Sequence, residues 1–309
     1  MSTLTQKVAT SGQLRQIIRV AQDAAEKSIT EFGLSKNGAQ RVHAHGDDLA
    51  ETVRTAVIAS LNDLSVTDKF KNEEVPSKYG YLSGYKPKGL TEQANRLREL
   101  FPGLGFANLD YQKKVESGEI KLPTGAEGWF AIPNWKKNKK LFGATYSAAV
   151  LVVLEAIRKD RNNRFQNYRE NQIDEAHLRQ SVRSEKFWQV LAEAQGNPDI
   201  LIVPAQFGKR HAGRSVRRAI EVMDDNGNEF GPGAFAVGIM LLTHPERLQH
   251  YDDLWIDCAG DEFDFSASAV RFVRAPYFRF SGDRVGFDTR RVSDPSEFCG
   301  SASGFSPQQ

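Results

Sequence analysis

The N-terminal part of the chain carries two stretches in which apolar residues recur every three or four positions. Between residues 11 and 32 this spacing places Leu14 and further apolar side chains on one face of a helix, and Gly33 supplies a stop. A second helix is predicted over residues 47–64, after a polar connector that ends in aspartates suited to capping. Together they predict a helical hairpin in residues 1–66, whose apolar stripes need a surface to cover them.

The pattern changes in the rest of the chain. Residues 67–140 are broken by prolines and glycines and predict a loop-rich basic segment with one short helix over 91–101. In residues 141–309 an apolar run at 148–154 fits either a buried strand or a helix. A helix is predicted over 174–194, strands over 200–203, 219–223, 234–242 and 254–257, and a hairpin over 277–288. The sequence therefore predicts an α+β fold, with the N-terminal helical hairpin packed on a mixed-sheet, β-rich C-terminal half.

Composition adds few constraints. The chain has 309 residues, of which 40% are hydrophobic and 26% charged, as expected for one large or two ordinary folded domains. It has two cysteines and no apolar stretch near eighteen residues, so we expect a cytoplasmic protein that does not span a membrane.

Charge is distributed unevenly although the net charge is only +2. Residues 68–220 hold 27 Lys and Arg against 17 Asp and Glu, whereas residues 221–309 hold seven against fifteen. A basic region attracts polyanions, and an acidic region can neutralise it within one molecule or between two copies. The second case predicts a self-assembling protein, and the helical stripes also permit a homo-oligomer.

Three basic clusters lie beside aromatic residues, and this combination suits single-stranded or structured RNA or DNA. Cations neutralise phosphates, while aromatic faces stack on unpaired bases. Nucleic-acid binding is therefore the leading functional hypothesis. The candidate contact residues are Lys136, Lys137, Lys139 and Lys140 in the first cluster, Arg158, Arg161, Arg164 and Tyr168 in the second, and Lys209, Arg210, Arg214, Arg217 and Arg218 in the third.

Carboxylates around the strand predicted at 254–257 support a different hypothesis. Carboxylate oxygens bind divalent cations such as Mg²⁺, and alternation along a strand would place Asp253 and Asp257 on one face. With Asp261, and with His211 or His244 as a proton carrier, they would form a metal-dependent phosphodiester hydrolase.

Two shorter motifs carry weaker signals. His43, His45 and Asp47 have the His-x-His-x-Asp spacing of metallohydrolase loops that bind zinc, but a capped helix connector explains the same residues. The glycine-rich stretch 231–236 matches a permissive dinucleotide fingerprint, but Pro232 removes a backbone donor, so we expect a bend between strands.

Overall fold

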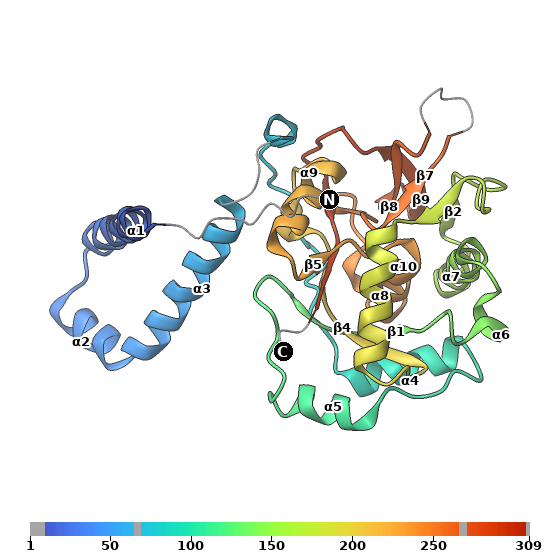
Figure 1. Ribbon diagram of the computed structural model, residues 1–309, viewed down its shortest axis with the longest axis horizontal. Helices are drawn as coiled ribbons and strands as arrows, with labels where there is room; N and C mark the ends of the chain where they lie inside the picture. The colour runs from blue at the N-terminus through green and yellow to red at the C-terminus, as the bar shows by residue number, and fades with distance from the viewer. Residues whose placement is uncertain (1–9, 65–68, 266–270, 307–309) are drawn as a thin grey trace. The chain divides into compact units, whose positions relative to one another are not determined.

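The computed structural model describes residues 10–64, 69–265 and 271–306, and the chain divides into two units, residues 1–64 and 65–309 (Figure 1). Helices make up the described part of the first unit, and the C-terminal half of the chain is rich in strands, which confirms the predicted α+β class. Within the described ranges, no helix combines the length and the apolar character that crossing a bilayer requires.

The first unit consists of α1 (Ser11–Phe32), α2 (Lys36–Ala44) and α3 (Gly46–Leu64). The helix predicted over residues 11–32 is confirmed, and local signals set its ends. Thr10 and Gln13 form a capping box at its start, and Gly33 adopts a left-handed conformation (φ +66°) at its end. The predicted polar connector is itself helical, as α2. No residue of α1 or α2 is buried, so these helices contribute no core.

Two sheets organise the second unit. The smaller sheet has the order β1-β4-β11-β5, with every neighbour antiparallel. Its strands are β1 (Gly128–Pro133), β4 (Ile200–Gln206), β5 (Glu229–Phe230) and β11 (Ser303–Phe305). β4 contains the predicted strand 200–203 and is buried along its whole length. Such a run can lie only inside the molecule.

The larger sheet runs in the order β10-β6-β8-β7-β3, and β9 pairs with both β8 and β2. The predicted hairpin at 277–288 is confirmed within a longer antiparallel pair, in which Ser281 lies opposite Arg284. The strands are β2 (Phe165–Asn167), β3 (Leu178–Gln180), β6 (Trp255–Asp257), β7 (Asp261–Phe263), β8 (Arg274–Ser281), β9 (Arg284–Arg291) and β10 (Cys299–Ser301).

Helices surround and separate these sheets. The apolar run at 148–154 lies in a helix, α7 (Tyr146–Asp160). The predicted helix 174–194 begins only at Val182, because Leu178–Gln180 form β3. The helical elements are η1 (Lys71–Glu73), α4 (Leu90–Leu100), α5 (Leu109–Glu116), α6 (Lys139–Phe142), α7 (Tyr146–Asp160), α8 (Val182–Ala194), η2 (Lys209–His211), α9 (Val216–Asn226), α10 (Ala234–Thr243) and η3 (Pro245–Arg247).

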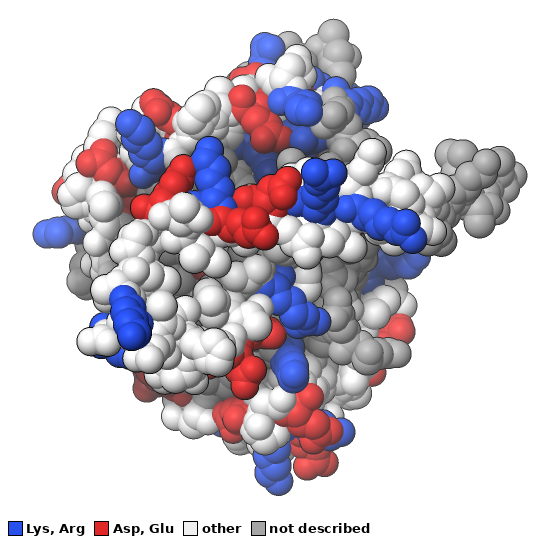
Figure 2. All heavy atoms as spheres, turned by 90° about the vertical axis from the view of Figure 1, so that its left-hand side faces the viewer, with Lys and Arg blue, Asp and Glu red and all other residues white. Residues whose placement is uncertain are grey.

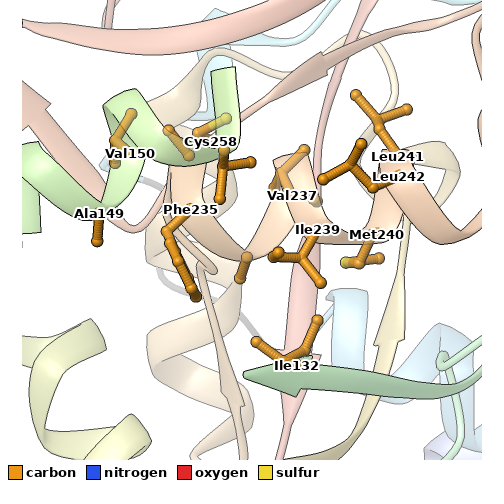
Figure 3. Packing of buried hydrophobic residues seen from close by; sticks show 14 of the residues in the cluster. Ile132, Ala149, Val150, Phe235, Val237, Ile239, Met240, Leu241, Leu242 and Cys258 are labelled. Carbon is orange, nitrogen blue, oxygen red and sulfur yellow. The ribbon is translucent and has the colours of Figure 1, made fainter. Parts of the chain in front are cut away.

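The centre of the core is α10, of which all ten residues are buried (Figure 3). It packs on α7, where a Cβ on Gly238 would lie 2.5 Å from Val153 Cγ1, so glycine permits the close approach. The predicted strand 234–242 is therefore wrong, because a helix that is apolar all round shows no helical period.

The predicted strand 219–223 is also wrong. It belongs to α9, which begins at the cap Ser215 and buries Val216, Ala219 and Met223 at helical spacing. The Asn226-Gly227 pair ends this helix, with φ +68° at Gly227, and does not form the expected hairpin turn.

Candidate functional site

A cavity of about 380 Å³ opens in the second unit where β1 ends beside α8 and the start of α10. Its volume lies in the range of small-ligand sites. Aromatic and aliphatic side chains form most of its wall, and amide side chains, two lysines and the carboxylate of Glu193 supply polar groups. The lining residues are Ile132, Pro133, Asn134, Trp135, Lys136, Lys137, Gln180, Trp188, Gln189, Ala192, Glu193, Asn197, Leu201, Phe235 and Ala236.

The turn after β1 presents Trp135 and the two lysines. The Asn134 backbone N–H donates to the Asp199 carbonyl at 2.8 Å, and its side-chain oxygen accepts from the Lys137 N–H at 3.3 Å. The Asn138 side chain donates to the carbonyls of Asn134 and Asp199 at 3.0 and 3.1 Å. Because the polar groups of this turn are bonded to one another and to the chain just before β4, Trp135 projects from a fixed backbone.

Trp188 reaches the cavity from the middle of α8. Its ring meets Phe230 edge-on at 5.3 Å, while the neighbouring Phe187 stacks on the same phenylalanine at 4.9 Å. Trp135 in turn lies 5.8 Å from the ring of Tyr146. Trp135 and Trp188 are each partly exposed. Each indole therefore packs on another aromatic ring and still borders the cavity, so both can serve as rigid stacking surfaces.

The lysines at the cavity are paired only weakly. The Lys136 ammonium lies 2.6 Å from Glu185, and the Lys137 ammonium lies 3.6 Å from Asp199. The lysine side chains are 45% and 47% exposed, and ion pairs in water contribute about 0–1 kcal/mol. An anionic ligand can therefore displace these carboxylates at low cost.

Behind the cavity wall lies a buried carboxyl group, Asp261. It accepts hydrogen bonds from the Ala234 N–H at the start of α10 and from the Tyr146 hydroxyl, both at 2.7 Å. Gln180, which lies opposite Asp261 on the neighbouring strand, lines the cavity, as does Phe235, the residue after Ala234. Burial raises the pKa of Asp261 to about 7, and the two hydrogen bonds lower it only in part. Asp261 thus caps α10, so this helix start is not open to a phosphate.

Strand β5, the glycine-rich stretch and α10 follow the strand–loop–helix order of a dinucleotide site, contrary to the bend between strands that we predicted. Gly233 leaves the space that Asp261 fills, since a Cβ there would lie 2.1 Å from both the Asp261 Oδ1 and the Tyr146 hydroxyl. The loop consequently binds the protein's own carboxylate where a dinucleotide site would bind pyrophosphate.

The other two candidate aspartates hold the structure together. Asp253 accepts from the Leu82 N–H and Ser83 hydroxyl at 3.0 Å and from the N–H groups of Gln249 and His250 at 2.8 Å. Asp257 is buried against Arg290 at 3.2 Å. Burial raises the pKa of Asp257, and Arg290 opposes that effect.

The two candidate histidines are buried as well. His211 Nε2 lies 2.8 Å from Glu229, and His211 Nδ1 accepts a hydrogen bond from Arg214 at 3.1 Å. Burial lowers the pKa of His211 and so favours the neutral ring, in which one nitrogen donates and the other accepts. Burial also lowers the pKa of His244 to about 4, and its Nε2 accepts from the Lys88 N–H at 3.0 Å. Neither ring is placed to carry protons for the candidate aspartates.

The three candidate metal ligands near the N-terminus do not form a centre. His43 lies in the last turn of α2, and His45 is the residue after that helix. Asp47 lies in the first turn of α3, where the helix dipole stabilises a negatively charged carboxylate. Across the described ranges, no three His, Cys, Asp or Glu side chains come together to hold a metal ion. This finding applies equally to Asp253, Asp257 and Asp261.

Carboxylates within the unit occupy most of the third basic cluster. Arg210 pairs with buried Glu229 at 3.1 Å, and Arg214 lies 3.6 Å from Glu74. Arg217 pairs with Glu73, and Arg218 pairs with Glu74 and Glu221. Burial would raise the pKa of Glu229, but His211, Arg210 and Ser303 beside it lower the value to about 2. Lys209 is exposed.

The second cluster is divided. Arg158 pairs with Glu155, and Arg161 donates to the Pro245 carbonyl at 2.6 Å. Arg164 is exposed, and Tyr168 is 47% exposed with the Arg279 guanidinium 5.2 Å from its ring. Figure 2 shows the face on the left-hand side of Figure 1, where Lys and Arg side chains are interspersed with Asp and Glu.

In the first cluster, Lys136 and Lys137 line the same cavity as two tryptophans, and Lys139 and Lys140 are exposed at the start of α6. Arg158 of the second cluster also lines a cavity, of about 390 Å³, but no tryptophan borders it and the arginine is paired there with Glu155. Sequence reasoning singled out these lysines and the aromatic residues beside them but missed Gln180, Trp188 and Gln189, which lie at least forty residues further on. Trp188 matched the buried side of a helix, and its contact with the cavity follows from tertiary packing.

Comparison with known proteins identifies no relative: no family model, no curated protein and no solved structure matches this chain.

Proposed function

We propose that the protein binds single-stranded nucleic acid, with one base in the cavity and the adjoining phosphates on the first basic cluster. The observation that carries the proposal is the joint presence of Trp135, Trp188, Lys136 and Lys137 around one cavity of about 380 Å³. Stacking on an aromatic side chain contributes roughly 1–3 kcal/mol per base, and lysines bind phosphates as point charges.

The polar lining suits a base better than an aliphatic ligand. Asn134, Gln180 and Gln189 carry amides. The Asn134 oxygen accepts from the Lys137 N–H and the Gln189 amide donates to Glu193, and the remaining donors and acceptors of the three side chains can bond the edge of an unpaired base. A base inside a duplex is stacked and paired, so it cannot enter a cavity of this kind. The proposal therefore specifies a single strand or a nucleotide at a strand end.

The metal-dependent hydrolase has less support, because the described carboxylates and histidines form no three-ligand group. Asp253 and Asp257 are also engaged in structural contacts. Binding without metal is accordingly the better-supported function.

The test is the salt dependence of binding to a fluorescent mixed-sequence single strand, measured by polarisation. Lys136→Ala/Lys137→Ala should weaken binding and lower the slope of log affinity against log salt by about 1.4, because each phosphate contact to a single strand contributes about 0.7.

The matched control is Lys113→Ala/Lys114→Ala, which removes the same charge from an exposed pair on α5. It should leave the slope unchanged. Equal effects of the two double variants, or the absence of binding at low salt, would overturn the proposal. A duplex of the same sequence should bind more weakly than the single strand.

A further inference from the structure

Helix α1 exposes a continuous apolar stripe that no described residue of its own unit, residues 10–64, buries. Leu14 is 47% exposed, Ile18 55% and Phe32 78%, and no residue of the helix is buried. Helical spacing places these side chains on one face together with Ala21 and Ala25, which are partly covered. Isolated helices are marginal in water, so this face favours association with another apolar surface.

The stripe has a symmetric pattern about Asp23. Leu14 and Phe32 lie nine residues on either side of it, Ile17 and Ile29 six, and Ala21 and Ala25 two. An antiparallel pair of α1 helices crossing at this level thus places each of these positions level with another apolar residue of the second copy. The remaining stripe residue, Ile18, comes level with Ser28. Such a contact is isologous and closes as a dimer.

Side-chain size follows the same symmetry. Ala21 and Ala25 flank the crossing point, and small residues there let helix axes approach to about 8 Å. The bulky Leu14 and Phe32 lie at the two ends, which are about 27 Å apart at 1.5 Å per residue. The seam would therefore be narrow at its centre and filled at both ends.

Charge favours a second copy over a lipid surface. The polar face of α1 carries three basic residues, Arg15, Arg19 and Lys27, against the acidic Asp23, Glu26 and Glu31. Helices that lie on anionic membranes are rich in Lys and Arg on that face.

The available area is sufficient for a dimer. The five large apolar side chains of the stripe expose on the order of 600 Å² per chain, the lower end for a stable interface.

We propose that the protein forms a two-fold symmetric dimer in which α1 pairs antiparallel with α1 of a second copy, crossing at Asp23. The dimer does not depend on the cavity of the second unit.

Single cysteines in the full chain test this geometry with a short thiol-to-thiol cross-linker, since Cys258 and Cys299 are buried. Gln22→Cys lies at the edge of the seam beside the crossing point, so the two copies should cross-link in high yield. Asp23→Cys points away from the seam and should not. Ser28→Cys tests direction, because its two copies would be about 15 Å apart along the axis in an antiparallel pair but level in a parallel one.

Sedimentation equilibrium supplies the second readout. The 34.5-kDa chain should sediment as a dimer, and Ile18→Glu should weaken association at least tenfold, whereas Gln16→Glu on the opposite face should not. Tryptophan fluorescence reports on the second unit alone, because Trp129, Trp135, Trp188 and Trp255 all lie there, and should not change. A monomer at every concentration, or cross-linking through Ser28→Cys, would overturn the proposal.

Discussion

The buried carboxyl group of Asp261 should make the stability of the second unit depend on pH in an unusual direction. Desolvation raises its pKa from 3.8 to about 7 in the folded state. Below pH 4 both states hold the proton. Between pH 4 and 7 the unfolded chain has lost it while the folded chain keeps it, so stability falls as pH rises. Above pH 7 both states are ionised, and the loss stays constant.

The magnitude follows from the size of the shift. About three pKa units at 1.36 kcal/mol each give a loss of about 4 kcal/mol between pH 4 and 7. Asp261→Asn cannot ionise, and its side-chain oxygen can still accept from the Ala234 N–H. The stability of the variant should therefore lack the pH dependence that Asp261 contributes to the wild type.

The assay is urea unfolding followed by tryptophan fluorescence at half-unit pH steps from 4 to 8, for the wild type and Asp261→Asn. Subtracting one free energy of unfolding from the other removes groups common to both proteins. The wild type should lose about 4 kcal/mol relative to the variant as pH rises to 7. A difference that stays constant across this range would refute the assignment of a buried, protonated carboxyl group.

Three further substitutions test the packing around the site. Gly233→Ala should cost roughly 3 kcal/mol, because its Cβ would collide with Asp261 and Tyr146, whereas Gly89→Ala, with open space around its Cβ, should change the melting temperature little. Glu229→Gln should cost roughly 3–5 kcal/mol in urea unfolding, since it removes the buried carboxylate charge that pairs with Arg210. Lys136→Ala should change stability by less than about 0.5 kcal/mol, because its ion pair is exposed; a larger loss would mean that the lysine has a structural role.

The sequence predicted those elements whose formation depends on local signals. The helix at 11–32 has a clear apolar period, a capping box and a terminal glycine, and the hairpin at 277–288 alternates apolar and polar residues around Ser281-Gly282-Asp283. A capping box, a terminal glycine and a tight turn all act between residues close in sequence, so the sequence alone shows them.

Where burial is complete, that information disappears. The run at 234–242 reads as a strand because every face of α10 is covered, and only the neighbours, above all α7, determine that it is helical. The arginines at 210–218 are a related case, because their partners Glu73, Glu74 and Glu229 are distant in sequence. Composition could not show that these charges are neutralised internally.

Only the part of the candidate site that is contiguous in the sequence could be predicted. Trp135 and the four lysines lie within six residues of one another, so their combination is visible in the sequence. The opposite wall comes from β3, α8 and the start of α10, and their approach to the turn after β1 is a tertiary event. Without the tertiary structure, Gln180 and Trp188 could not have been assigned to the same site as Trp135.

Photochemical cross-linking tests the proposed nucleic-acid site most directly. A single strand that carries 4-thiouridine at alternate positions, irradiated on the wild-type protein and digested, yields peptides whose attachment sites mass spectrometry can locate. The proposed site predicts adducts at Trp135 or Trp188, lost when excess unlabelled strand competes. Competed adducts confined to residues 209–218, or to any peptide that does not line the cavity, would contradict it.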